Sequence, residues 1–123
     1  MLLKWDVLRV RPPGVGHPKL AVCISPRRVW FFYVNSKRPQ GRKRGPLAIE
    51  LQPYHGQFLT KVCFLDTTEC PYLPDQVVKD ALATPADCLG TLSPTVRSWV
   101  VACVRGHGAL EPEQRFTVLE GEP

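Results

Sequence analysis

The stretch Val29-Trp30-Phe31-Phe32-Tyr33-Val34 decides the fold expected for this chain. It is the densest run of β-branched and aromatic residues in the sequence, and such residues favour strands. The apolar run Lys19–Ile24 precedes it, and only Ser25-Pro26-Arg27-Arg28 lies between the two, which is short enough for a hairpin. Because neighbouring residues of a strand point to opposite faces, the adjacent rings from Trp30 to Tyr33 cannot all enter one core.

Three more segments around this hairpin predict short strands: Asp6–Val10, Leu47–Leu51 and Phe58–Leu65. Leu73–Leu82 fits either a short helix or an extended edge followed by one turn. Strands that recur roughly every 10 to 15 residues, with Pro/Gly turns between them, are typical of a small SH3-like barrel. We therefore expect a mainly β fold with some α-helix.

One helix is clearly indicated near the C-terminus, at about residues 94–105. Ser93 is a good N-cap, and Pro94 stands at the first helical position, where its missing N–H costs nothing. Val96, Trp99, Val100 and Cys103 recur at the helical period, and Gly106 or Gly108 is expected to end the helix. The later segment 115–119 is expected to add a strand or simply to pack.

Composition limits the class of protein. The chain has 123 residues, 44% hydrophobic and 22% charged, which predicts one globular domain over 1–123 and excludes a disordered chain. No apolar run approaches the ~18 residues of a membrane span, and Met1–Asp6 lacks the apolar region of a secretory signal, so we expect a cytoplasmic protein without membrane contact. The five cysteines show no CxxC spacing, so neither a disulfide framework nor a metal site is expected, and no cofactor motif is present.

The charge is strongly polarised along the chain. Residues 1–61 hold 12 of the 16 Lys/Arg and a net charge of +10, whereas residues 62–123 have a net charge of −5. A basic loop follows the aromatic strand, with cations at Lys37, Arg38, Arg42, Lys43 and Arg44. Flexible cations beside aromatic rings suit single-stranded nucleic acid, because phosphates pair with the cations and bases stack on rings. The alternative is a solvated loop that only keeps the protein soluble.

His17 and Ser36 are the candidate catalytic residues. His17 lies in the Gly-rich loop after the first predicted strand, close to Lys19, and a loop histidine can act as a general acid or base near neutral pH. Ser36 ends the aromatic strand at the base of the basic loop. Metal-independent RNA cleavage needs a base for the 2′-OH, an acid for the leaving oxygen and a cation for the phosphorane. His17 and the Arg/Lys residues of the loop could supply these, and Ser36 could orient the phosphate or the 2′-OH by a hydrogen bond. The alternative for His17 is an ordinary exposed loop residue.

The order of these motifs resembles the PemK/MazF-like toxins of bacterial toxin–antitoxin systems. Trp5–Val10 resembles the family's opening strand, Gly14–Val22 its following loop and strand, and Val29–Ser36 the strand that ends at its active-site threonine. Phe58–Leu73 resembles the later strand pair, and Gly90–Ser93 with the helix after it resembles the family's C-terminal helix. The resemblance covers about residues 5–106 and leaves 107–123 as a C-terminal extension.

The resemblance implies an SH3-like barrel, a homodimer, metal-independent cleavage of single-stranded RNA and a groove that an acidic antitoxin can fill. His17 stands where the family has its catalytic arginine, so Lys19 or Arg11 is expected to replace that cation. Ser36 replaces the threonine and keeps the hydroxyl. We therefore expect a toxin-type endoribonuclease, with Lys19 and the five loop cations binding RNA. The alternatives are a non-catalytic SH3-like module that binds nucleic acid or protein, and an interaction subunit whose basic surface an acidic partner neutralises.

Overall fold

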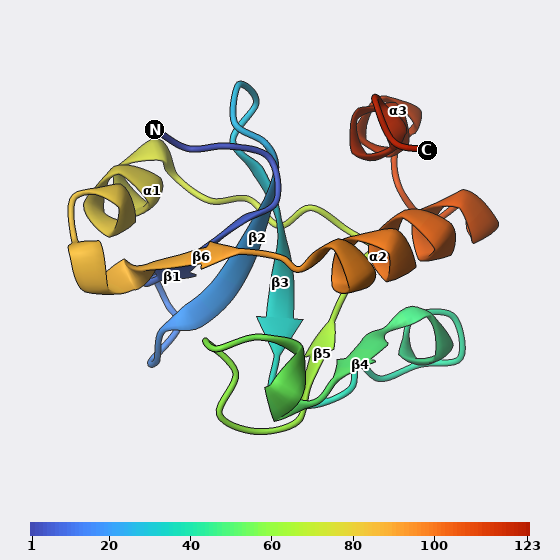
Figure 1. Cartoon of the computed structure of the whole chain (residues 1–123), viewed down its shortest axis with the longest axis horizontal. Coiled ribbons are helices and arrows are strands. Elements are labelled where there is room, and N and C mark those ends of the chain that lie inside the picture. Colours follow the sequence, from blue (N-terminus) through green and yellow to red (C-terminus); the bar gives the residue numbers. More distant parts are fainter.

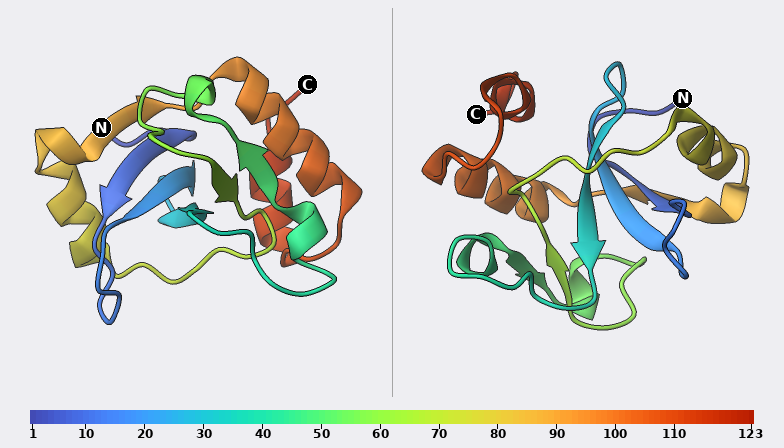
Figure 2. Two further views of the ribbon diagram at one scale, coloured as in Figure 1. Left: turned by 90° about the horizontal axis from the view of Figure 1, so that it is seen from below. Right: turned by 180° about the vertical axis from the view of Figure 1, so that it is seen from behind.

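The computed structural model describes all residues from 1 to 123 and contains one six-stranded antiparallel sheet with three α-helices. The sheet curls into a half-barrel (Figures 1 and 2) with the strand order β4-β5-β3-β2-β1-β6. The strands are β1 (Asp6–Val10), β2 (Lys19–Ser25), β3 (Trp30–Asn35), β4 (Ile49–Leu51), β5 (Cys63–Leu65) and β6 (Cys88–Thr91). The helices are α1 (Asp75–Leu82), α2 (Pro94–Gly106) and α3 (Pro112–Leu119). None of these helices is long and apolar enough to cross a membrane.

The β2–β3 hairpin is confirmed and lies at the centre of the sheet. Phe31 and Phe32 are both fully buried, but in different cores on the two faces of the sheet. Phe32 belongs to the larger core, which α2 and α3 cover, and Phe31 belongs to a smaller core that contains residues of α1. The flanking rings Trp30 and Tyr33 are half-buried. The aromatic run is therefore shared between two cores, as strand geometry requires.

The C-terminal helix is also confirmed, since α2 spans Pro94–Gly106. The Ser93 hydroxyl accepts a hydrogen bond from the Val96 N–H at 3.3 Å, which satisfies one of the free donors at the helix start. Val96, Val100 and Val104 form the buried stripe of the helix against the larger core. In the Leu73–Leu82 segment the helical alternative is the one found, as α1.

The structure corrects the strands expected elsewhere. Residues 115–119 form the last turns of α3 and not a strand, because Pro112 stands at the first turn of a helix that buries Val118. The strand expected over Phe58–Leu65 shrinks to β5, because residues 56–59 form a turn in which the Leu59 N–H donates to the Gly56 carbonyl at 3.1 Å. β6 was not expected, and it forms by pairing with the edge of β1.

Candidate functional site

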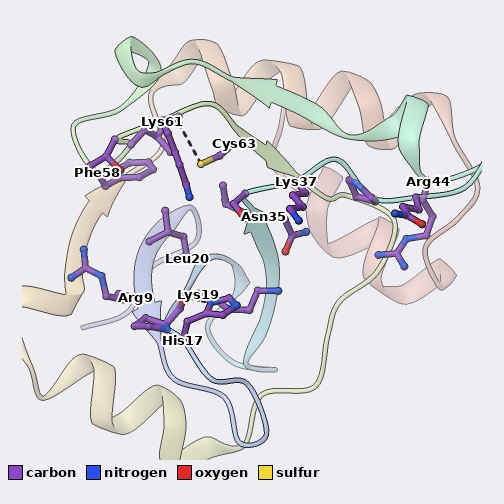
Figure 3. Close-up of a pocket in the computed structure, with 17 residues that line it drawn as sticks. Arg9, His17, Lys19, Leu20, Asn35, Lys37, Arg44, Phe58, Lys61 and Cys63 are labelled. Carbon is purple, nitrogen blue, oxygen red and sulfur yellow. Dashed lines mark hydrogen bonds between the residues drawn. The ribbon is translucent and has the colours of Figure 1, made fainter.

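A groove of about 570 Å³ opens where three connections meet: the β1–β2 loop, the end of β3 with the loop that follows, and the segment before β5 (Figure 3). Because each connection leaves the sheet on the same side, residues far apart in the sequence share this groove. Its lining consists of Arg9, His17, Pro18, Lys19, Leu20, Val34, Asn35, Ser36, Lys37, Pro39, Gln40, Arg44, Phe58, Leu59, Thr60, Lys61 and Cys63.

The charged side chains of the lining are all cationic. They are Arg9, Lys19, Lys37, Arg44 and Lys61, and no aspartate or glutamate accompanies them. The three lysines make no salt bridge, whereas Arg9 pairs with Asp87 and Arg44 with Asp66 and Glu69. A groove with unpaired cations and no lining carboxylate carries a positive potential that attracts anions.

The remainder of the lining is partly apolar. Val34, Leu59 and Cys63 are buried, and Leu20 and Phe58 are half-buried. In Figure 3, Phe58 and Lys61 lie on one side of the groove, and Arg9, His17 and Lys19 lie on the other. The groove therefore offers cations and an apolar surface to the same ligand.

His17 lies at the exposed rim of this groove. Its Nδ1 is 3.0 Å from the carbonyl oxygen of Pro18. A carbonyl oxygen only accepts, so this contact requires the proton on Nδ1 and leaves Nε2 of the neutral ring free to accept a proton. No hydrogen bond within the chain occupies the Ser36 hydroxyl, which is exposed in the same lining.

Lys19 connects the groove to a smaller adjoining cavity of about 200 Å³, whose other lining residues are Tyr33, Asn35, Arg44, Asp66, Glu69 and Pro71. Its ammonium lies 4.3 Å from the centre of the Tyr33 ring, within cation–π range. Burial lowers the pKa of Lys19, and attraction to Asp66 and Glu69 opposes that shift. Lys19 is thus a partly desolvated cation in the wall between the two cavities.

The structure separates the five cations of the basic loop into different environments. Lys37 and Arg44 line the groove, but Arg38, Arg42 and Lys43 do not. Arg38 stacks on Phe64 at 4.8 Å, donates to the Gly45 carbonyl at 2.9 Å and pairs with Glu50 at 3.5 Å. Arg42 and Lys43 are exposed outside the lining.

Arg11, the second residue expected to replace the catalytic arginine, lies outside the groove lining as well. Its guanidinium donates to the Asp87 carboxylate at 2.5 Å, a residue that is buried beside β6. These contacts hold the pKa of Asp87 below its ordinary value, the hydrogen bond from Arg11 being the main cause. Of the two replacement cations, only Lys19 shares the groove with His17.

Sequence reasoning missed Arg9, Lys61, Asn35 and Phe58 as lining residues of the groove. Each is an isolated residue of its type in a predicted strand or turn, so no run or motif marks it. The alternation of residues 6–10 does place Arg9 on the side opposite to its buried neighbours Leu8 and Val10. Val7, on the same face of β1 as Arg9, is fully buried, so this alternation indicates neither the exposure of Arg9 nor the groove.

A second polar cluster connects Thr67, Cys103 and His107 behind the sheet. The Ala109 N–H donates to Nδ1 of His107 at 3.1 Å, so Nε2 carries the proton and donates to the Thr67 hydroxyl at 3.0 Å. The Thr67 hydroxyl is also 3.4 Å from the Cys103 sulfur. Burial, followed by the charge of Arg115, lowers the pKa of His107. This cluster ties α2 to the segment after β5, with Thr67 fully buried and Cys103 and His107 half-buried.

No three His, Cys, Asp or Glu side chains gather closely enough to hold a metal ion. Comparison with known proteins returned no matching family model, curated protein or solved structure. The resemblance to the PemK/MazF-like toxins therefore stays a prediction that depends on the order of the sequence motifs.

Proposed function

We propose that the chain is a toxin-type endoribonuclease with a PemK/MazF-type, SH3-like barrel, which binds single-stranded RNA in the groove and cleaves it without a metal ion. The observation that carries this proposal is the lining of five cations and His17 with no carboxylate. Phosphodiesters supply the negative charge that such a lining attracts, and unpaired bases supply apolar surface for the rest of it. A homodimer and an acidic antitoxin partner are implied by the motif resemblance, and both stay predictions, as does a cytoplasmic location.

The proposed reaction is transfer of the phosphate to the neighbouring ribose oxygen. Nε2 of His17 takes the proton of the 2′-OH as O2′ forms its bond to phosphorus, and the bond between phosphorus and O5′ breaks. O5′ leaves with a proton from Lys19, whose pKa is lowered by burial. The products are a 2′,3′-cyclic phosphate and a 5′-OH, and Lys37 and Arg44 stabilise the charge on the phosphorane oxygens.

A non-catalytic binding module is the second candidate. The observation that favours it is that His17 is the one histidine in the lining and lies at the exposed rim, with no carboxylate to orient it. Cation-lined grooves bind RNA without cleaving it when no acid–base pair is positioned at the phosphate.

The first prediction concerns His17 and separates these two functions. Long mixed-sequence RNA is incubated with the wild type, with His17→Ala and with His55→Gln, a control at a turn histidine outside the groove, all in EDTA. We expect cleavage by the wild type and His55→Gln, with 2′,3′-cyclic phosphate ends, and a loss of about 100-fold or more in His17→Ala. RNA binding by His17→Ala is expected to stay within about 3-fold of wild type, because phosphate charge dominates affinity.

Two other results have definite meanings. Binding by the wild type without cleavage assigns the groove to the non-catalytic module. Absence of both binding and cleavage contradicts the proposed function altogether.

A further inference from the structure

We infer that Phe58 is a stacking platform for one unpaired nucleobase in the groove. The inference rests on the proposed binding of single-stranded nucleic acid, and it names how the groove would distinguish a base-bearing strand from other polyanions. It also assigns a specificity role to a residue outside the basic loop.

The first support is the mixed character of the lining. A ligand that is only an anion, such as a polyphosphate, gains nothing from the apolar side chains of Leu20 and Phe58. A single strand of nucleic acid alternates phosphates with flat apolar bases, and proteins bind it by combining cations with aromatic rings. Figure 3 shows Lys61 on the same side of the groove as Phe58, and this lysine makes no salt bridge, so a cation is available near the ring for a phosphate of the strand.

The second support is that Phe58 is the one ring of Phe, Tyr or Trp in the lining. The candidate rings nearby are already covered by cations, Tyr33 by Lys19 at 4.3 Å and Phe64 by Arg38 at 4.8 Å. No cation lies over Phe58, and its side chain is only half-buried. The ring therefore has surface to offer.

The third support is that the Phe58 ring lies against the backbone of Gly56, in space that a side chain at position 56 would occupy. A Cβ atom at position 56 would lie 2.9 Å from Cε1 and from Cζ of Phe58, which is too close for a real contact. The turn between these residues is closed by the hydrogen bond from the Leu59 N–H to the Gly56 carbonyl. The backbone of Gly56 is extended, with φ of −175°, so it suits any residue type and only the ring excludes a side chain there. Gly56→Ala is thus a way to displace the ring without altering a charge.

The test compares two fluorescent oligonucleotides of equal length, both 2′-O-methylated so that they resist cleavage. One carries uracil at every position and the other is abasic. Anisotropy gives the dissociation constants for wild type, Phe58→Leu, Phe58→Tyr and Gly56→Ala. We expect the wild type to prefer the base-bearing strand. Loss of one stacked base amounts to about 1–3 kcal/mol, so Phe58→Leu and Gly56→Ala are expected to weaken binding of that strand by about 5- to 150-fold.

Binding of the abasic strand is expected to be unchanged in these variants, and Phe58→Tyr is expected to keep the wild-type preference. Equal weakening for both strands would show that the ring only supports the fold of the groove, and equal binding of both strands by the wild type would overturn the inference while leaving polyanion binding intact. If the wild type binds neither strand, the proposed function fails together with the inference. Should Phe58→Leu not fold, as judged by circular dichroism, Phe58→Tyr and Gly56→Ala still decide the matter.

Discussion

Asp66 illustrates how a single side chain joins the groove to the core. The carboxylate is buried after β5, and it accepts hydrogen bonds from the Thr68 N–H at 2.9 Å, from the Thr68 hydroxyl at 2.6 Å and from Arg44. Burial by itself raises the pKa of Asp66, but the hydrogen bonds from Thr68 and Arg44 outweigh it and hold that pKa below its ordinary value. The ionised carboxylate therefore stabilises the fold and fixes the Arg44 guanidinium at the groove.

We predict that Asp66→Asn lowers the free energy of unfolding at pH 7 by about 1.5–3 kcal/mol, the range for hydrogen bonds to a charged group. Because the folded state lowers the pKa, the contribution is complete above the ordinary value of about 3.9 and is lost as the pH falls through the folded-state pKa. The free energy of unfolding of Asp66→Asn, measured with urea, should thus depend less on pH between about 5 and 3 than that of the wild type.

Glu69→Gln is the matched control, because Glu69 pairs with the same Arg44 at 2.9 Å but from an exposed position. Exposed pairs contribute little, so a change below about 1 kcal/mol is expected. An equal loss of unfolding free energy in both variants would contradict the role given to the buried carboxylate. So would an Asp66→Asn variant whose stability falls as steeply as that of the wild type when the pH is lowered from about 5 to 3.

At the scale of the elements, α3 depends on a contact from the other end of the chain. Lys4 donates to the carbonyls of Thr117, Val118 and Glu120 at 3.0, 2.9 and 3.1 Å. The last carbonyls of a helix have no partner within it, and a cation there also interacts favourably with the helix dipole. A helix of eight residues is too short to be stable alone, so this cap and the burial of Val118 hold it.

Lys4→Met keeps most of the stem but removes the donor. We predict that it lowers the free energy of unfolding by about 1–2 kcal/mol and speeds hydrogen exchange of the α3 amides more than those of α2. Lys79→Met, on the exposed last turn of α1, is the control and is expected to stay within about 0.5 kcal/mol of the wild type. Uniform acceleration of exchange over both helices would refute a local cap.

These elements also show why part of the fold was predictable. β1, β2, β3 and α2 were foreseen because their signals are local, an apolar run between Pro/Gly turns or a capped helical stripe. β6 carries Gly90 and mostly exposed side chains, and it is a strand only because the edge of β1 pairs with it. The β-forming residues 116–118 favour a strand in the sequence, whereas in the structure Pro112 begins a helix there and Lys4 caps its end.

At the scale of the whole molecule, salt bridges between the two halves of the chain neutralise part of the charge that is unevenly distributed along the sequence. Acids of the second half neutralise arginines of the first half, as in Arg28–Glu113, Arg44–Asp66 and Arg11–Asp87. The lysines of the groove are left without such partners. A net charge per segment predicts an attraction to polyanions but not which cations remain free, because the pairs join residues far apart in the chain. Lys37 could be proposed from the sequence because it belongs to a run of cations, whereas Lys61 stands alone in a predicted strand and no run marks it.

Because the groove lysines are unpaired, they lead to a prediction about the salt dependence of RNA binding. Each phosphate contact of a single strand contributes about 0.7 to the slope of log K against log salt concentration. Replacing Lys37 and Lys61 together by Ala, the two exposed lysines of the groove, is therefore expected to reduce the magnitude of that slope by about 1.4. The matched control removes Arg27, at the tip of the β2–β3 hairpin, and Lys79, on α1, two exposed cations outside the groove. Binding of a non-cleavable RNA measured between about 50 and 200 mM salt should give the wild-type slope for this control, since its charges are not next to a bound phosphate. If the control loses as much of the slope as the lysine variant, RNA is attracted by the net charge of the molecule and the groove is not its site.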